Sequence, residues 1–184
     1  LTAGYEGLAW AANNGASVIN MSWGGGGTST FGQNTVTAAY NQGAILVAAA
    51  GNDGNTSLLY PAAYSNVIAV ASTTNSDTRS SFSQYGTWIN ISAPGSNIRS
   101  TVATGNTYDR YNGTSMASPN VSGLLGLMKS YAPNATRADL VNCLYSSASA
   151  VTGNTGQMGA GRINAFAALQ CVSAFALQND AGIT

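Results

Sequence analysis

The chain has 184 residues, of which 45% are hydrophobic, so it is long enough to form one domain with a sizeable core. Only 7% of its residues are charged, its six Lys and Arg are scattered singly along the chain and balance six Asp and Glu, and it contains no histidine. This composition excludes an intrinsically disordered chain and argues against nucleic acid as a partner, because disorder requires high net charge and phosphate binding requires clustered cations.

The first half of the chain alternates segments of helical and strand character. Apolar residues at helical spacing end at residues 13–15, and a second helical segment over 31–40 ends at Gly43. Short β-rich or continuously apolar runs predict four strands, over residues 17–22, 44–50, 67–71 and 88–92. Because continuously apolar strands are typical of parallel sheets that helices cover on both faces, we predict an α/β fold.

The second half of the chain is predicted to be mainly helical. It opens with a two-stranded hairpin over residues 98–111, outside the main sheet, with a turn at 104–106. Residues 115–131 carry apolar side chains on nearly every face, which predicts a central, buried helix. Two further helices are expected, over residues 137–146 and 163–172.

We assign residues 1–173 to part of one domain and residues 174–184 to a tail or a linker to a following module. Leu1 follows neither a start methionine nor a signal-peptide pattern, so we expect that an upstream segment has been removed. No apolar run approaches the ~18 residues that suggest a membrane span, so no membrane partner is expected. Low charge and two cysteines favour a secreted protein. Cys143 and Cys171 are expected to form either a disulfide or two buried thiols.

Three glycine-edged segments, 22–25, 50–53 and 112–119, follow predicted strands or the hairpin, where open parallel sheets place their ligand crevice. Ser115 falls at the start of the predicted buried helix. Its oxygen would lie near the positive end of the helix dipole, and neighbouring N–H groups would point to where negative charge develops in acyl transfer. An isolated serine at this position could instead simply cap the helix.

The segment Asn-Gly-Thr-Ser-Met-Ala-Ser-Pro at 112–119, together with the apolar helix after it, resembles the nucleophile segment of the subtilisin-like serine peptidases. Two upstream segments match in the order of that family. Residues 18–25 resemble the strand that binds substrate, and residues 47–52 resemble the segment whose Asn side chain completes the oxyanion hole. The resemblance covers about residues 3–170 and implies a three-layer α/β fold, with a mostly parallel sheet and helices on both faces, incomplete at its N-terminal side.

On this resemblance, Ser115 is the catalytic nucleophile of a serine endopeptidase and Asn52 is its oxyanion-hole side chain. The resemblance implies that an extended protein or peptide substrate pairs with the strand at residues 22–24 and enters a main specificity pocket, which we expect to be shallow. The residues predicted to bind substrate in this way are Ser22, Trp23, Gly24, Ala50, Gly51 and Leu59.

The catalytic Asp and His of this family precede the matched segments, and neither of their motifs occurs in the chain. We therefore expect the chain alone to be inactive, since loss of the triad histidine lowers the turnover of subtilisin about 10⁶-fold. The resemblance implies that the N-terminal part of the same domain is a partner, possibly as a separate chain.

Catalysis of this type needs no cofactor. Relatives in the family often bind a structural calcium ion through backbone carbonyls that match residues 62–67 and a carboxylate that matches Asn90. Because Asn90 is neutral and the number of charged ligands sets calcium affinity, we do not expect tight binding of a structural calcium ion there.

Two other functions remain open from the sequence. The groove could bind extended peptides without cutting them, as expected if the upstream sequence lacks the Asp and His segments. The chain could also be an unrelated exported adhesion or structural domain, in which case an all-β fold is expected.

Overall fold

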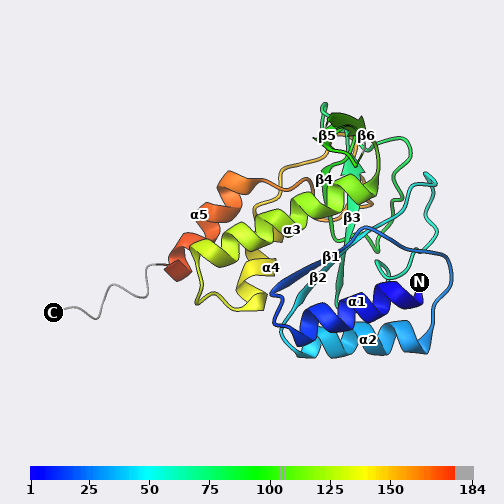
Figure 1. Cartoon of the computed structure of the whole chain (residues 1–184). Coiled ribbons are helices and arrows are strands. Elements are labelled where there is room, and N and C mark those ends of the chain that lie inside the picture. Colours follow the sequence, from blue (N-terminus) through cyan, green and yellow to red (C-terminus); the bar gives the residue numbers. More distant parts are fainter. Residues whose placement is uncertain (104, 106, 177–184) are drawn as a thin grey trace.

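The computed structural model describes residues 1–103, 105 and 107–176. Its main sheet has four parallel strands in the spatial order β1 (Val18–Met21), β2 (Ile45–Ala49), β3 (Val67–Thr73) and β4 (Ile91–Pro94). Two helices, α1 (Thr2–Asn13) and α2 (Thr30–Asn41), cover one face. Three helices cover the other, α3 (Thr114–Tyr131), α4 (Arg137–Ser146) and α5 (Ala165–Ala176) (Figure 1). The predicted three-layer α/β architecture is confirmed.

The two central strands show why this sequence forms layers. Every residue of β2 and β3 is buried, and successive side chains of a strand point to opposite faces. Leu46 and Ala48 pack with α1 and α2, whereas Ile45 and Val47 pack with α3, α4 and α5. The continuously apolar sequence of β2 is thus needed on both faces. β1 forms one edge of this sheet within the described residues.

The strand predicted over residues 88–92 is wrong at its start, because β4 begins at Ile91. Residues 87 and 88 form a turn, closed by a hydrogen bond from the Ile89 N–H to the Gly86 carbonyl at 3.2 Å. Beside β3, the Asn90 side chain Oδ1 accepts the Ala69 N–H at 2.7 Å, in the place of a strand carbonyl.

The last helix also differs from the prediction over 163–172. The Asn164 side chain accepts the N–H of Ala167 at 3.1 Å, so α5 starts after Asn164, and it continues to Ala176. Residues 177–184, most of the predicted tail, lie outside the described residues. The boundary between the domain and the tail, placed at residue 173, stays a prediction.

The predicted hairpin is confirmed as a separate two-stranded antiparallel sheet of β5 (Ile98–Thr101) and β6 (Tyr108–Tyr111). Of its predicted turn, residues 104 and 106 lie outside the described residues. Cys143 of α4 and Cys171 of α5 form a disulfide, which decides between the two alternatives for these cysteines. None of the helices described is long and apolar enough to cross a membrane.

Candidate active site

The carboxyl ends of β1 and β2 meet the N-terminus of α3, and this junction places Ser115 beside Ser22. Ser115 is the second residue of α3 and is partly exposed. Its hydroxyl donates to the Ser22 carbonyl at 3.2 Å, and the Ser22 hydroxyl donates to the Ser115 carbonyl at 3.0 Å. This reciprocal pair fixes the residue after β1 against the first turn of α3.

Asn52, which follows β2, is bound to the same turn. Its Oδ1 accepts the Thr114 N–H at 2.8 Å and the Thr114 hydroxyl at 3.0 Å, and that hydroxyl accepts the Gly51 N–H at 3.0 Å. Because the oxygen is held in this way, the side-chain NH₂ of Asn52 is the group that can donate to a ligand. This Nδ2 is 3.7 Å from the position that a Cβ on Gly113 would take, so it lies beside the start of α3.

The first turn of α3 supplies a second donor. Helix N-terminal N–H groups have no partner within the helix. Asn52 accepts that of Thr114, whereas the N–H of Ser115 has no acceptor among the described residues. The start of α3 therefore brings together a serine hydroxyl and two uncharged donors, the Ser115 N–H and the Asn52 NH₂.

Gln84, which the sequence analysis missed, holds the loop that carries Asn52. Gln84 is 1% exposed. Its side-chain Oε1 accepts the Asp53 N–H at 2.7 Å, and its backbone N–H donates to the Gly51 carbonyl at 3.0 Å. Gly51 has φ +116°, and a Cβ there would lie 2.7 Å from the Gln84 amide. Only glycine suits this position. No sequence pattern marks Gln84, since an isolated glutamine in a loop is ordinarily solvated.

Asn20 of β1 is a second residue that the sequence analysis missed. Its Oδ1 accepts the hydroxyls of Ser118 at 2.6 Å and Ser122 at 3.2 Å, and its Nδ2 donates to the Ser22 hydroxyl at 2.8 Å. The network ties one face of α3 to the end of β1 and so fixes the orientation of the helix.

The predicted substrate-binding residues are partly brought together. The Trp23 ring packs edge-on against Tyr5, with centroids 5.1 Å apart. Gly24 lies against Leu59, since a Cβ on Gly24 would be 2.8 Å from the Leu59 Cδ2. Ala50 is fully buried and its N–H donates to the Val70 carbonyl at 3.0 Å, so it does not reach the surface of the site.

Comparison with known proteins agrees with the resemblance found in the sequence. A sequence profile described as the Subtilase family matches residues 2–161. The chain belongs to the subtilase family. Over 169 residues it is 44% identical to the thermitase of Thermoactinomyces vulgaris, covering 92% of this chain and 60% of the thermitase. It is 49% identical over 166 residues to an extracellular protease of Xanthomonas campestris pv. campestris, covering 85% of this chain and 29% of that protease.

The fold comparison agrees with this membership. A solved structure of a protease from Pseudoalteromonas arctica superimposes with a TM-score of 0.84 at 32% identity, over 91% of this chain and 57% of that one. The chain thus spans about 60% or less of these relatives. An incomplete subtilase fold is consistent with this coverage.

The subtilase site described above contains no group that titrates near neutral pH, because its side chains are serine, threonine, asparagine and glutamine. Tyr5, a buried phenol, touches Trp23. A phenol is protonated at neutral pH even at its ordinary pKa, and burial, followed by the contact with Tyr64, raises the pKa of Tyr5 further. Among these site residues, no side chain is a ready proton acceptor near neutral pH.

The calcium site of some relatives does not fit the residues present here. The Asn90 Oδ1 is already an acceptor for the Ala69 N–H. Asn90 and Arg137 both line a cavity of about 530 Å³, and the positive charge of Arg137 disfavours a cation there. Among the residues described, no group of three or more His, Cys, Asp and Glu is placed to hold a metal ion.

Proposed function

We propose that this chain provides the nucleophile and the oxyanion hole of a subtilisin-type serine endopeptidase, with Ser115 and Asn52 in these roles. The observation that supports the proposal most strongly is the grouping of the Ser115 hydroxyl with two free donors, its own N–H and the Asn52 NH₂. Donors placed in this way stabilise the negative charge that develops on a carbonyl oxygen during acyl transfer.

The reaction follows from this arrangement. The Ser115 oxygen attacks the carbonyl carbon of a peptide bond, and the two donors bind the oxyanion. The serine proton passes to an imidazole and then to the leaving amine, and water hydrolyses the acyl-enzyme by the reverse proton path. Because the chain has no histidine, we propose that the imidazole and its carboxylate partner come from outside these 184 residues. The chain alone is expected to be inactive.

The sheet edge formed by β1 indicates where the missing N-terminal part could bind. Within the described residues β1 has a strand partner only on the β2 side, and an unpaired strand edge offers backbone groups for further pairing. We propose that the N-terminal part of the same domain, in the same polypeptide or as a separate chain, covers this edge. An extended protein or peptide substrate would pair with residues 22–24.

Secretion is part of the same proposal. A disulfide persists in oxidising surroundings, and the Xanthomonas relative is named an extracellular protease. The low charge of the chain fits such a protein. We propose no cofactor for catalysis.

A second candidate, a groove that binds peptides without cutting them, is favoured by the absence of histidine from the chain. A fluorophosphonate probe separates the two. We call the intact protein this chain together with the proposed N-terminal part of its domain. The peptidase proposal predicts labelling of Ser115 in the intact protein and none in the isolated chain. Labelling of another serine, or none in the intact protein, would favour the second candidate.

A further inference from the structure

Arg99 and Arg110 are directly opposite each other in the β5–β6 hairpin. Opposite residues of an antiparallel pair have their side chains on the same face, with Cβ atoms about 5 Å apart, and like charges there destabilise the pair. The chain has only six cations in all. Placing two of them at this spacing works against folding of the hairpin, so the stability of the hairpin does not explain them.

Neither arginine has a carboxylate partner among the residues that the structure describes. The Arg99 guanidinium lies 5.1 Å from the centroid of the Tyr108 ring, and Arg110 donates to the Asn97 carbonyl at 3.1 Å. Asp109, the nearest acid in sequence, accepts the backbone N–H of Arg110 at 2.7 Å. By the alternation of side chains along a strand, Asp109 belongs to the opposite face of the hairpin. The two positive charges are therefore uncompensated.

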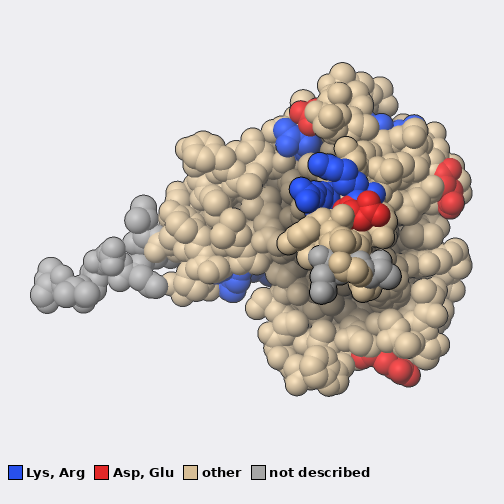
Figure 2. All heavy atoms as spheres, turned by 45° about the horizontal axis from the view of Figure 1, so that its top comes forward, with Lys and Arg blue, Asp and Glu red and all other residues tan. Residues whose placement is uncertain are grey.

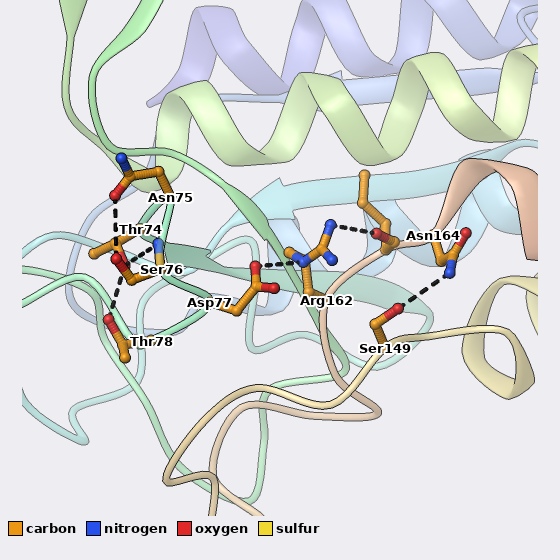
Figure 3. A network of polar contacts seen from close by, with 9 residues as sticks. Thr74, Asn75, Ser76, Asp77, Thr78, Ser149, Arg162 and Asn164 are labelled. Atoms are coloured by element: carbon orange, nitrogen blue, oxygen red, sulfur yellow. Dashed lines mark hydrogen bonds and ion pairs between the residues drawn. The ribbon is translucent and has the colours of Figure 1, made fainter.

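A hollow lies beside the hairpin, and Arg110 is part of its lining. Arg110, Arg162 and the amide-bearing Asn75 and Asn97 line a cavity of about 640 Å³. Asp77 pairs with Arg162 at 2.7 Å in the network of Figure 3, which leaves Arg110 as the unpaired charge of this cavity. Figure 2 shows several basic side chains close together on one face, with acidic side chains beside them, while most of the remaining visible surface is uncharged.

The hairpin is joined directly to the nucleophile turn. Ser115 follows Arg110 by five positions, so their Cα atoms are no more than about 18 Å apart. The Asn97 N–H donates to the Asn112 side chain at 2.7 Å, and the Gly113 N–H donates to the Gly95 carbonyl at 2.8 Å. An extended peptide covers this distance with about five residues.

We propose that Arg99 and Arg110 bind carboxylate side chains of the substrate, so that the enzyme prefers polypeptides with acidic residues within about five positions of the cleaved bond. The inference rests on the proposed function and names a substrate class for that site. A guanidinium matches a carboxylate with two parallel hydrogen bonds. Nucleic acid is the weaker candidate, because its affinity grows with the number of cations in contact with phosphates, and the hairpin offers two.

The test compares two fluorogenic peptides in the intact protein, identical except for Glu or Gln at positions two to five from the cleaved bond, on either side. The ratio of their kcat/KM values is expected to favour the Glu peptide about 3- to 20-fold at low salt, since exposed ion pairs are individually weak, and to approach one at 0.5 M NaCl. The double variant Arg99→Gln/Arg110→Gln should lose this preference while keeping its rate on the Gln peptide. The matched double variant to Lys keeps the charges and should retain it. A preference unchanged in the Gln variant would overturn the proposal.

Binding to the Ser115→Ala variant of the intact protein separates this inference from the peptidase proposal, because it needs no cleavage. A rhodamine-labelled Glu-rich peptide is expected to bind at least threefold more tightly than its Gln counterpart, and the difference should vanish in the Gln double variant. Equal binding of the two peptides contradicts the inference even if the enzyme cleaves both. Tighter binding of a single-stranded oligonucleotide of the same charge would assign the surface to nucleic acid instead.

Discussion

The nucleophile turn and the β5–β6 hairpin are adjacent in the chain and differ in how they are built. The turn is uncharged, and neutral hydrogen bonds to the ends of β1 and β2 fix it. The hairpin has almost entirely exposed strand residues and carries its charges without ion pairs among the described residues. Neutral bonds in a partly buried site hold geometry to fractions of an ångström, whereas exposed charges act through water and are screened by salt. We infer that catalysis depends on the first region and substrate preference on the second.

The largest loss of activity is expected from removal of the proposed nucleophile. Ser115→Ala in the intact protein is expected to lower kcat by about 10⁶-fold and to abolish fluorophosphonate labelling. Ser122→Ala is the control, since that hydroxyl lies two helical turns further along α3 and bonds to Asn20 and to the Ser118 carbonyl. Retained labelling in the first variant would show that the turn is not the catalytic centre.

The next largest effect is expected at the oxyanion donor. Asn52→Leu should lower kcat about 10²- to 10³-fold with little change in KM, because the lost NH₂ acts on the transition state and not on the bound substrate. Steady-state kinetics on a neutral peptide measures both constants. Thr114→Ser keeps the hydroxyl that bonds to Asn52 and should stay near the original rate. A loss confined to KM would remove Asn52 from the role proposed.

Much of this molecule could be predicted from its sequence, because continuous apolar runs and glycine-edged loops determine layers and strand ends. The start of β4 could not be, since a side-chain amide of Asn90 replaces a strand carbonyl at 2.7 Å. Gln84 was missed because its function depends on burial. Arg99 and Arg110 look scattered in the sequence, yet the register of the predicted hairpin pairs them. The register of the predicted hairpin could therefore have revealed the pairing of these two arginines.

Gln84→Ala tests how firmly the turn is fixed. The change leaves the Asp53 N–H without its acceptor and opens a space in a fully packed site, so the free energy of unfolding should fall by about 2–3 kcal/mol. Urea denaturation measures the change. Gln170→Ala, at an exposed position, should alter stability by less than about 0.5 kcal/mol. Equal effects of the two variants would contradict the function given to Gln84.

The smallest effect is expected on stability, from a change in the hairpin. Arg99→Gln/Arg110→Gln should raise the free energy of unfolding by about 0.2–0.5 kcal/mol at low salt, because it removes two facing like charges, and by nothing measurable at 0.5 M NaCl. The same urea experiment at both salt concentrations detects it. A clear loss of stability would mean that the arginines hold the hairpin together and would weaken their assignment to substrate.

The central claim is that one oxyanion can touch both the Ser115 N–H and the Asn52 NH₂ while bonded to the Ser115 oxygen. A crystal structure of the intact protein inactivated by a fluorophosphonate tests it directly. Phosphorus is expected on the Ser115 Oγ, with a phosphoryl oxygen about 2.7–3.1 Å from both nitrogen atoms. Phosphorus on another side chain, or an oxygen turned away from Asn52, would contradict it.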